Sequence, residues 1–174
     1  MKELEEKIMM KNENEEKKKY SRDVIIQMIS RQLKNDRIEI TKRSNKDGGG
    51  ILLTYPDGST RTAMLRKSRN YVIDNPEKFA DDYSFRCWHV LRYNPEHYIT
   101  FDIYIFAVEN DNNDLDFFVL PKKNLELLLE KKEKGKNDTY HFYFAKSKTG
   151  DLVEDRDTPV KVNPYFNSWE MILS

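Results

Sequence analysis

The chain has 174 residues, a formal net charge of zero, 34% charged and 38% hydrophobic residues, and a mean hydropathy of -0.84. This length suits one domain and is short for two. No apolar run approaches the roughly 18 residues that span a bilayer, and the first ten residues are charged, so we expect a cytoplasmic protein that does not enter a membrane. The lone Cys87 excludes an internal disulfide and a zinc site built from cysteines.

The charges are unevenly distributed along the chain. Residues 1–20 hold six lysines and six glutamates, residues 21–92 hold 14 basic against 9 acidic residues, and residues 93–174 hold 10 against 15. Parts of opposite sign indicate a nucleic-acid surface on the first part, or a surface for a protein partner or a second copy; chance variation in so polar a chain is the plain alternative. We expect residues 1–20 to form a charged arm, flexible or helical, and residues 21–174 to form a single globular α/β domain.

The first predicted element of the domain is a helix. Ile25, Met28, Ile29 and Leu33 follow helical spacing, and Ser21 stands where an N-cap belongs. The period then changes to two over residues 37–43, 51–55 and 60–68, with the turn segment PDGS before the last run. This part of the sequence predicts a meander of three short strands.

The second half of the domain also contains predicted strands. Residues 85–93, 101–108, 115–121 and 139–145 read as strands, and residues 122–135 read as a helix with Gly135 as its C-cap. Residues 101–108 have almost no polar position, which is typical of a central strand buried on both faces. The sequence predicts an α+β (mixed α/β) domain with a central mixed sheet of about five to six strands flanked by helices.

This order of elements resembles the PD-(D/E)xK nuclease superfamily when it is read with five segments of the sequence. They are DGGGILLTYPDGSTRTAMLRKSR, FRCWHVL, FDIYIFAV, DFFVLP and KKNLELLL, and the resemblance covers roughly residues 21–132. It implies a restriction-endonuclease-like fold in which a helix precedes a meander with an acid on one strand and an acid-x-lysine on the next. Members of that family hold one or two Mg²⁺ ions, because a metal must activate the water and neutralise the charge that grows on the phosphate.

The catalytic positions depart from the pattern of the family. The strand that should begin with the first acid reads GIL from Gly50, and the acid-x-lysine position reads MLR from Met64. A shift of one residue brings Lys67 to the lysine position but leaves Leu65 at the acid. Arginine does not readily replace a lysine that orients water. We therefore expect a catalytically inactive relative, with no catalytic residue, no metal ligand and no cofactor.

Basic residues gather around the same strand. The candidate nucleic-acid-binding residues are Arg43, Lys46, Arg61, Arg66, Lys67 and Arg69. In the fold that the resemblance implies, this edge faces the nucleic-acid groove, and guanidinium groups suit phosphates in geometry as well as charge. The plain alternative is a solvated face whose arginine stems pack on apolar neighbours.

Three hypotheses of function follow. The first is an inactive nuclease-like protein that binds nucleic acid, DNA rather than RNA, or a protein complex; the composition would suit a mobile element, a phage, or a defence or counter-defence system. The second is an active Mg²⁺-dependent endonuclease with displaced carboxylates at Glu39, Asp47 and Asp57, and with Lys67 orienting water. The third is a module for protein interaction or homo-oligomerisation through the opposed charges.

Overall fold

The computed structural model describes residues 2–8 and 20–173. Its helices and strands are α2 (Arg22–Leu33), β1 (Glu39–Lys42), β2 (Ile51–Thr54), β3 (Thr60–Ser68), α3 (Tyr71–Asp74), α4 (Pro76–Phe79), β4 (Tyr83–Arg86), β5 (His89–Arg92), β6 (Ile103–Glu109), β7 (Leu115–Pro121), α5 (Lys122–Leu129), β8 (Thr139–Phe142), β9 (Phe144–Ser147), β10 (Leu152–Glu154) and β11 (Val160–Lys161). Short 3₁₀ segments are η1 (Lys34–Asp36), η2 (Asn45–Asp47), η3 (Lys136–Asp138), η4 (Asn163–Tyr165) and η5 (Trp169–Ile172).

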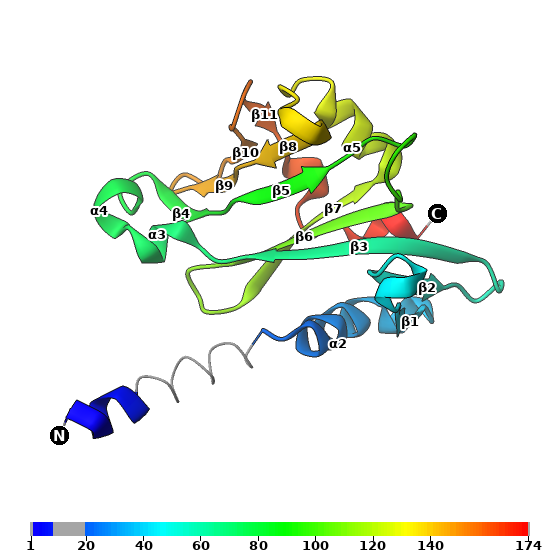
Figure 1. Ribbon diagram of the computed structural model, residues 1–174, viewed down its shortest axis with the longest axis horizontal. Helices are drawn as coiled ribbons and strands as arrows, with labels where there is room; N and C mark the ends of the chain where they lie inside the picture. The colour runs from blue at the N-terminus through cyan, green and yellow to red at the C-terminus, as the bar shows by residue number, and fades with distance from the viewer. Residues whose placement is uncertain (1, 9–19, 174) are drawn as a thin grey trace.

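The architecture is mixed α+β, as the sequence predicted. A five-stranded mixed sheet has the order β1-β2-β3-β6-β7. Strands β1, β2 and β3 form an antiparallel meander, β3 pairs in parallel with β6, and β6 pairs antiparallel with β7. A four-stranded sheet, β11-β10-β9-β4, and the pair β5-β8 form a second layer over it (Figure 1).

Strand β6 lies inside the central sheet and is buried on both faces. Tyr104, Phe106 and Val108 enter one hydrophobic cluster, and the alternating Ile103, Ile105 and Ala107 enter the other. Alternate side chains of a strand point to opposite faces, so an unbroken apolar run requires cover on both. The expectation of a buried central strand is thereby confirmed, although the strand spans Ile103–Glu109 and not residues 101–108.

Helix α2 covers one face of the sheet. Ser21 caps it, because its Oγ accepts a hydrogen bond from the amide of Val24 at 3.3 Å. Ile25, Ile29 and Leu33 lie on one side of the helix and are buried in the cluster that contains Ile103 and its neighbours. Figure 1 shows α2 below the central sheet, on the side opposite β5.

The other face is covered by an aromatic layer. Phe118 of β7 stacks on Phe144 of β9 with ring centroids 4.5 Å apart, and Phe142 lies 5.7 Å from Phe144. Phe166, near the C-terminus, packs 5.5 Å from Phe118. Large rings that meet in this way stabilise the layer beyond their buried area.

Two predicted strands are each divided in the structure. Residues 85–93 become the end of β4 and β5, and residues 139–145 become β8 and β9, with the halves in different sheets. At each break a backbone amide donates to a side chain in place of a strand carbonyl: Trp88 to Ser68 Oγ at 3.1 Å, and Tyr143 to Glu154 Oε2 at 3.2 Å. Such a bond frees the chain to leave one ladder and join another.

The predicted helix at residues 122–135 is too long. Helix α5 ends at Leu129 with Glu130 as its C-cap, and Gly135 instead precedes η3. The chain turns after Leu129, and Lys132 beyond the turn forms a buried ion pair with Glu154 and Asp157.

Part of the predicted arm is described. Residues 2–8 are helical and exposed, whereas residues 9–19 lie outside the described residues. Within the described ranges, no helix combines the length and the apolar character needed to cross a membrane.

Candidate nucleic-acid interface

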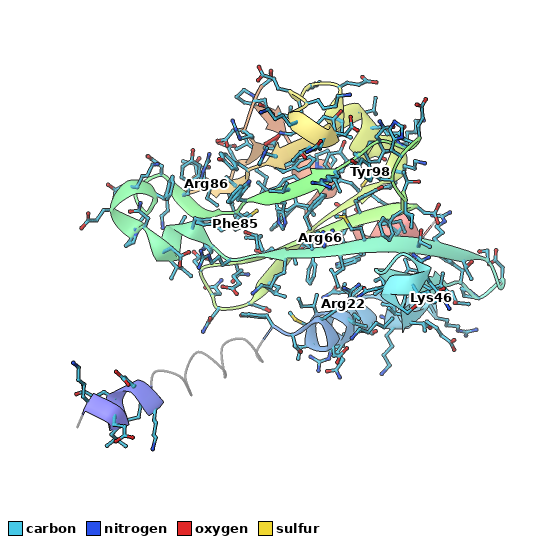
Figure 2. The ribbon with its side chains drawn as sticks, viewed as in Figure 1. Arg22, Lys46, Arg66, Phe85, Arg86 and Tyr98 are labelled. Atoms are coloured by element: carbon cyan, nitrogen blue, oxygen red, sulfur yellow. The ribbon has the colours of Figure 1, made fainter. Side chains whose placement is uncertain are left out.

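The basic residues of β3 point to opposite faces of the central sheet. Ala63 and Leu65 enter the cluster under α2, whereas Met64 enters the aromatic cluster on the other side. By strand alternation Lys67 therefore points toward α2 and Arg66 toward β5. Figure 2 shows Arg66 on the β5 side of β3, with Arg22 of α2 beyond the opposite face.

On the α2 face, the charged groups of Lys67 and Arg61 each contact neighbouring side chains. The Nζ of Lys67 lies 2.8 Å from Glu109 Oε1 and 5.1 Å from the ring centroid of Tyr20. The guanidinium of Arg61 lies 5.2 Å from the centroid of the Tyr55 ring. These contacts favour a structural role for the two residues.

Arg43 and Lys46 lie in the connection between β1 and β2. The Nη1 of Arg43 donates to the carbonyl of Gly49 at 3.0 Å, and its Nη2 donates to the carbonyl of Asp47. Arg43 thus holds the loop through two hydrogen bonds to its backbone carbonyls. Lys46 is exposed and has no ion-pair partner among the residues that the structure describes.

Arg69 follows the end of β3. Its Nε lies 3.1 Å from Asp74 Oδ2, and its guanidinium lies 5.4 Å from the centroid of the Tyr71 ring. The predicted set is therefore spread over two faces and two ends of the sheet and does not form one patch. Lys67 and Arg69 form ion pairs, Arg43 is bonded to loop carbonyls and Arg61 lies against Tyr55, whereas Arg66 and Lys46 are exposed and form no ion pair within the described part of the chain.

Three positions on the β5 face correspond to the metal-binding positions of the resemblance. Ile51 pairs with Ala63, so Gly50 lies beside Met64, with Arg66 two residues further along β3. Met64 is 3% exposed and packed in the aromatic cluster. A glycine, a buried thioether and a guanidinium offer no ligand to Mg²⁺, which prefers oxygen. The residues at these positions do not fit the metal.

The displaced carboxylates of the second hypothesis do not converge. Asp47 lies in η2, near the start of β2, whereas Glu39 pairs with Thr54 at its end and Asp57 lies in the hairpin beyond. The four residues of β2 separate these ends by roughly 13 Å at about 3.3 Å per residue. Among residues 2–8 and 20–173, no group of three or more His, Cys, Asp or Glu is placed to hold a metal ion.

Two of the acids near β3 have local structural partners. Asp57 accepts from the amide of Ser59 at 2.9 Å and from its hydroxyl at 2.6 Å, and these hydrogen bonds lower the pKa of the Asp57 carboxyl. Asp102, just before β6, accepts from the amide of Thr62 at 2.8 Å. One carboxylate fixes the hairpin and the other fixes the start of β6 against β3.

Comparison of the chain with protein-family models, with curated proteins and with solved structures gave no match.

His89 of β5 is buried close enough to Arg66 to be affected by its charge. Its ring is 4% exposed and lies 5.0 Å from the centroid of Phe106 and 6.1 Å from that of Phe144. Burial, and then the charge of Arg66, lower the pKa of His89 to about 3. The neutral ring packs as an aromatic residue, as the strand pattern suggests, and brings no positive charge to the site.

The burial of His89 predicts a dependence of stability on pH. The ordinary pKa of about 6.5 applies to the unfolded chain, so below that pH the unfolded state binds a proton that the folded state refuses. The free energy of unfolding is therefore at its full value above about pH 6.5. Between pH 6.5 and pH 3 it falls by up to about 1.4 kcal/mol per pH unit. In urea unfolding between pH 7 and pH 4, the free energy of unfolding should fall less with decreasing pH for His89→Phe than for the wild type. Exposed His97→Asn should track the wild type; parallel curves for all three would contradict the burial argument.

A cavity that the sequence did not predict lies beside the end of β3 at Ser68. Its volume is about 310 Å³, and it is lined by Tyr71, Lys78, Phe79, Arg86, Cys87, Trp88 and Tyr143. These residues come from α3, α4, β4 and the breaks after β4 and β8. The aromatic content of residues 139–145 was visible in the sequence, but its meeting with α3 and α4 depends on the two divided strands.

Arg86 forms a fixed wall of this cavity. Its Nη1 donates to Asp155 Oδ2 at 2.9 Å, and Nη2 lies 2.9 Å from Oδ1. The rings of Tyr83 and Tyr143 each lie 5.0 Å from the guanidinium carbon. A guanidinium held by a carboxylate and two rings keeps one orientation.

Proposed function

We propose that this protein binds nucleic acid without cutting it, DNA rather than RNA, through the face of β3 that carries Arg66. The observation that supports the proposal is the identity of the residues at three neighbouring positions on that face. Gly50, Met64 and Arg66 stand where the resemblance to PD-(D/E)xK nucleases places an acid, a second acid and a lysine. An exposed guanidinium retains the attraction for phosphate, whereas glycine and buried methionine remove the metal ligands.

The order of the elements supports the same proposal. Helix α2 leads into the antiparallel meander of β1, β2 and β3, and the apolar β6, then β7 and α5 follow. That order is the one that the resemblance implies. The β5 face of β3 is also free of the competing carboxylate that Glu109 supplies to Lys67 on the α2 face.

Removing the guanidinium of Arg66 tests the proposal. Arg66→Ala is expected to weaken binding to a labelled DNA duplex about tenfold at low salt, because one phosphate contact is lost. The slope of log affinity against log salt should fall by about one unit. Fluorescence anisotropy at several salt concentrations measures both quantities, and Lys46→Ala shows whether the interface reaches the loop before β2.

Arg31→Ala is the matched control. Arg31 is exposed on α2, beyond the opposite face of the sheet, so the variant loses the same charge elsewhere. It should retain the wild-type affinity and salt slope. Equal losses in the two arginine variants would indicate attraction by overall charge alone. No binding by the wild type at low salt would remove the proposal and direct attention to a protein partner.

A further inference from the structure

The cavity beside β3 has walls suited to a flat aromatic ligand. Four of its lining residues are aromatic, namely Tyr71, Phe79, Trp88 and Tyr143. Its volume of about 310 Å³ lies at the lower end of the range for small-ligand sites, roughly 300 to 1,000 Å³. Aromatic side chains stack on nucleobases irrespective of sequence, since every base has a π-face.

Trp88 is held in place as an open platform at this cavity. Its side chain is 45% exposed, yet its Nε1 donates to Nδ1 of His141 at 3.0 Å and the two rings stack with centroids 5.9 Å apart. The backbone amide of Trp88 is fixed by Ser68 at the end of β3. An exposed indole that is already ordered loses little conformational entropy when a ligand stacks on it.

Cations lie against the rings of the cavity. The Nζ of Lys78 lies 5.1 Å from the centroid of Phe79, and the guanidinium of Arg156 lies 5.4 Å from that of Tyr143. Neither cation forms an ion pair within residues 2–8 and 20–173. Arg69 contacts Tyr71 from the β3 side, although Asp74 offsets its charge. The surroundings of the apolar cavity therefore favour an anionic group on the ligand.

The chemistry of the lining favours binding over reaction. Cys87 lines the cavity and has a side chain that could act as a nucleophile. It is 1% exposed, however, and its Sγ donates to the carbonyl of Phe144 at 3.3 Å. Burial raises the pKa of the Cys87 thiol, so the sulfur remains protonated at neutral pH. Arg86 is committed to Asp155.

We infer that the cavity binds one unstacked nucleotide, with the base between the aromatic side chains and the phosphate near Lys78 and Arg156. The shared chemistry is a nucleobase joined to a phosphate, supplied by an unpaired position of a nucleic-acid strand or by a free nucleotide. The strand form rests on the proposed function, since Arg66 lies on the same face of β3 as Ser68, two residues from the contact with Trp88. The free-nucleotide form does not rest on it.

Tryptophan fluorescence tests the inference directly. The chain has two tryptophans, and Trp169 packs beneath the sheet against Phe117 at 5.3 Å, so Trp169→Phe leaves Trp88 as the reporter. Thymidine 5′-monophosphate and a short oligothymidine strand should quench its emission to saturation. Ribose 5-phosphate, which has the phosphate but no base, should not.

Variants separate stacking from folding. Trp88→Ala and, independently, Tyr143→Leu should weaken binding of the oligothymidine strand about tenfold, measured by anisotropy, whereas Trp88→Phe should retain most of it. Val90→Ala is the matched control, because Val90 is 44% exposed and follows two residues later on β5, outside the cavity lining. Equal thermal midpoints among these variants assign the loss to the platform.

Each outcome distinguishes the cavity from the proposed function. Quenching by the mononucleotide without binding of any strand supports the cavity as a free-nucleotide site and removes the proposed function. Duplex binding that depends on Arg66, with no quenching by nucleotide or strand, overturns the cavity inference and leaves the proposed function intact. Quenching by ribose 5-phosphate equal to that by the nucleotide overturns recognition of the base.

Discussion

Lys132→Met is expected to lower the free energy of unfolding by about 3 to 5 kcal/mol, because it leaves two carboxylates without their cation. The side chains of Lys132 and Glu154 are each 1% exposed and form an ion pair, and Asp157 Oδ2 lies 3.1 Å from the same Nζ. Nζ also lies 4.8 Å from the centroid of Phe142. Glu154 has a further task, since its Oε2 accepts from the amides of Tyr143 and Arg156 at 3.2 and 2.9 Å. Urea unfolding measures the loss.

The control for Lys132 is two residues away in the chain. Lys134 pairs with Asp138 at 3.3 Å but is 54% exposed, so Lys134→Met should cost less than about 1 kcal/mol. Adding Glu154→Gln to Lys132→Met should recover part of the loss, because the amide oxygen still accepts from the backbone and one buried charge is gone. Equal losses for the two lysine variants would show that the buried pair does not carry the stability assigned to it.

Gly50→Ala is expected to cost about 3 to 5 kcal/mol, the second large effect, through backbone strain and a steric clash together. Gly50 has φ +72°, and a Cβ there would overlap the carbonyl oxygen of Ala63 and lie 2.8 Å from Cε1 of Phe101. The same clash faces an aspartate, so the first acid position of the nuclease resemblance cannot be filled without moving β3. Thermal or urea unfolding measures the change.

Gly58→Ala separates the two causes of that loss. Gly58 lies in the β2–β3 hairpin with φ +85°, and a Cβ there meets nothing within 4 Å. It should cost about 1 to 2 kcal/mol from conformation alone. A Gly50 variant no worse than the Gly58 variant would mean that β3 yields readily, and that an acid at position 50 is sterically possible.

Local patterns in the sequence predicted much of the fold. Ser21 and the apolar spacing after it predicted α2, the PDGS turn predicted the β2–β3 hairpin, and the unbroken apolar run predicted β6, because each signal is contained within its own element. The divided strands were missed because Trp88 and Tyr143 donate their amides to side chains 20 and 11 residues away. The early end of α5 is accompanied by the ion pair of Lys132 with Glu154, a contact 22 residues away that no local pattern contains.

The candidate site was less accessible to sequence reasoning. Alternation along β3 would have placed Arg66 and Lys67 on opposite faces, so that separation was readable. The partners of Lys67 and Arg69 were not, since Glu109 and the α3 turn reach them only through tertiary packing. The aromatic residues of the cavity were visible in the sequence, but their meeting was not, because Tyr71, Trp88 and Tyr143 come from α3 and from the breaks after β4 and β8.

One titration tests the central claim most directly. Purified protein is mixed with a labelled DNA duplex at low and high salt, with and without Mg²⁺ or Mn²⁺, and both complex formation and strand cleavage are followed. The account predicts binding that weakens steeply with salt and DNA that stays intact with either metal. Metal-dependent cleavage, abolished by Asp47→Ala or Asp57→Ala, would contradict it and establish a metal site built from these displaced carboxylates.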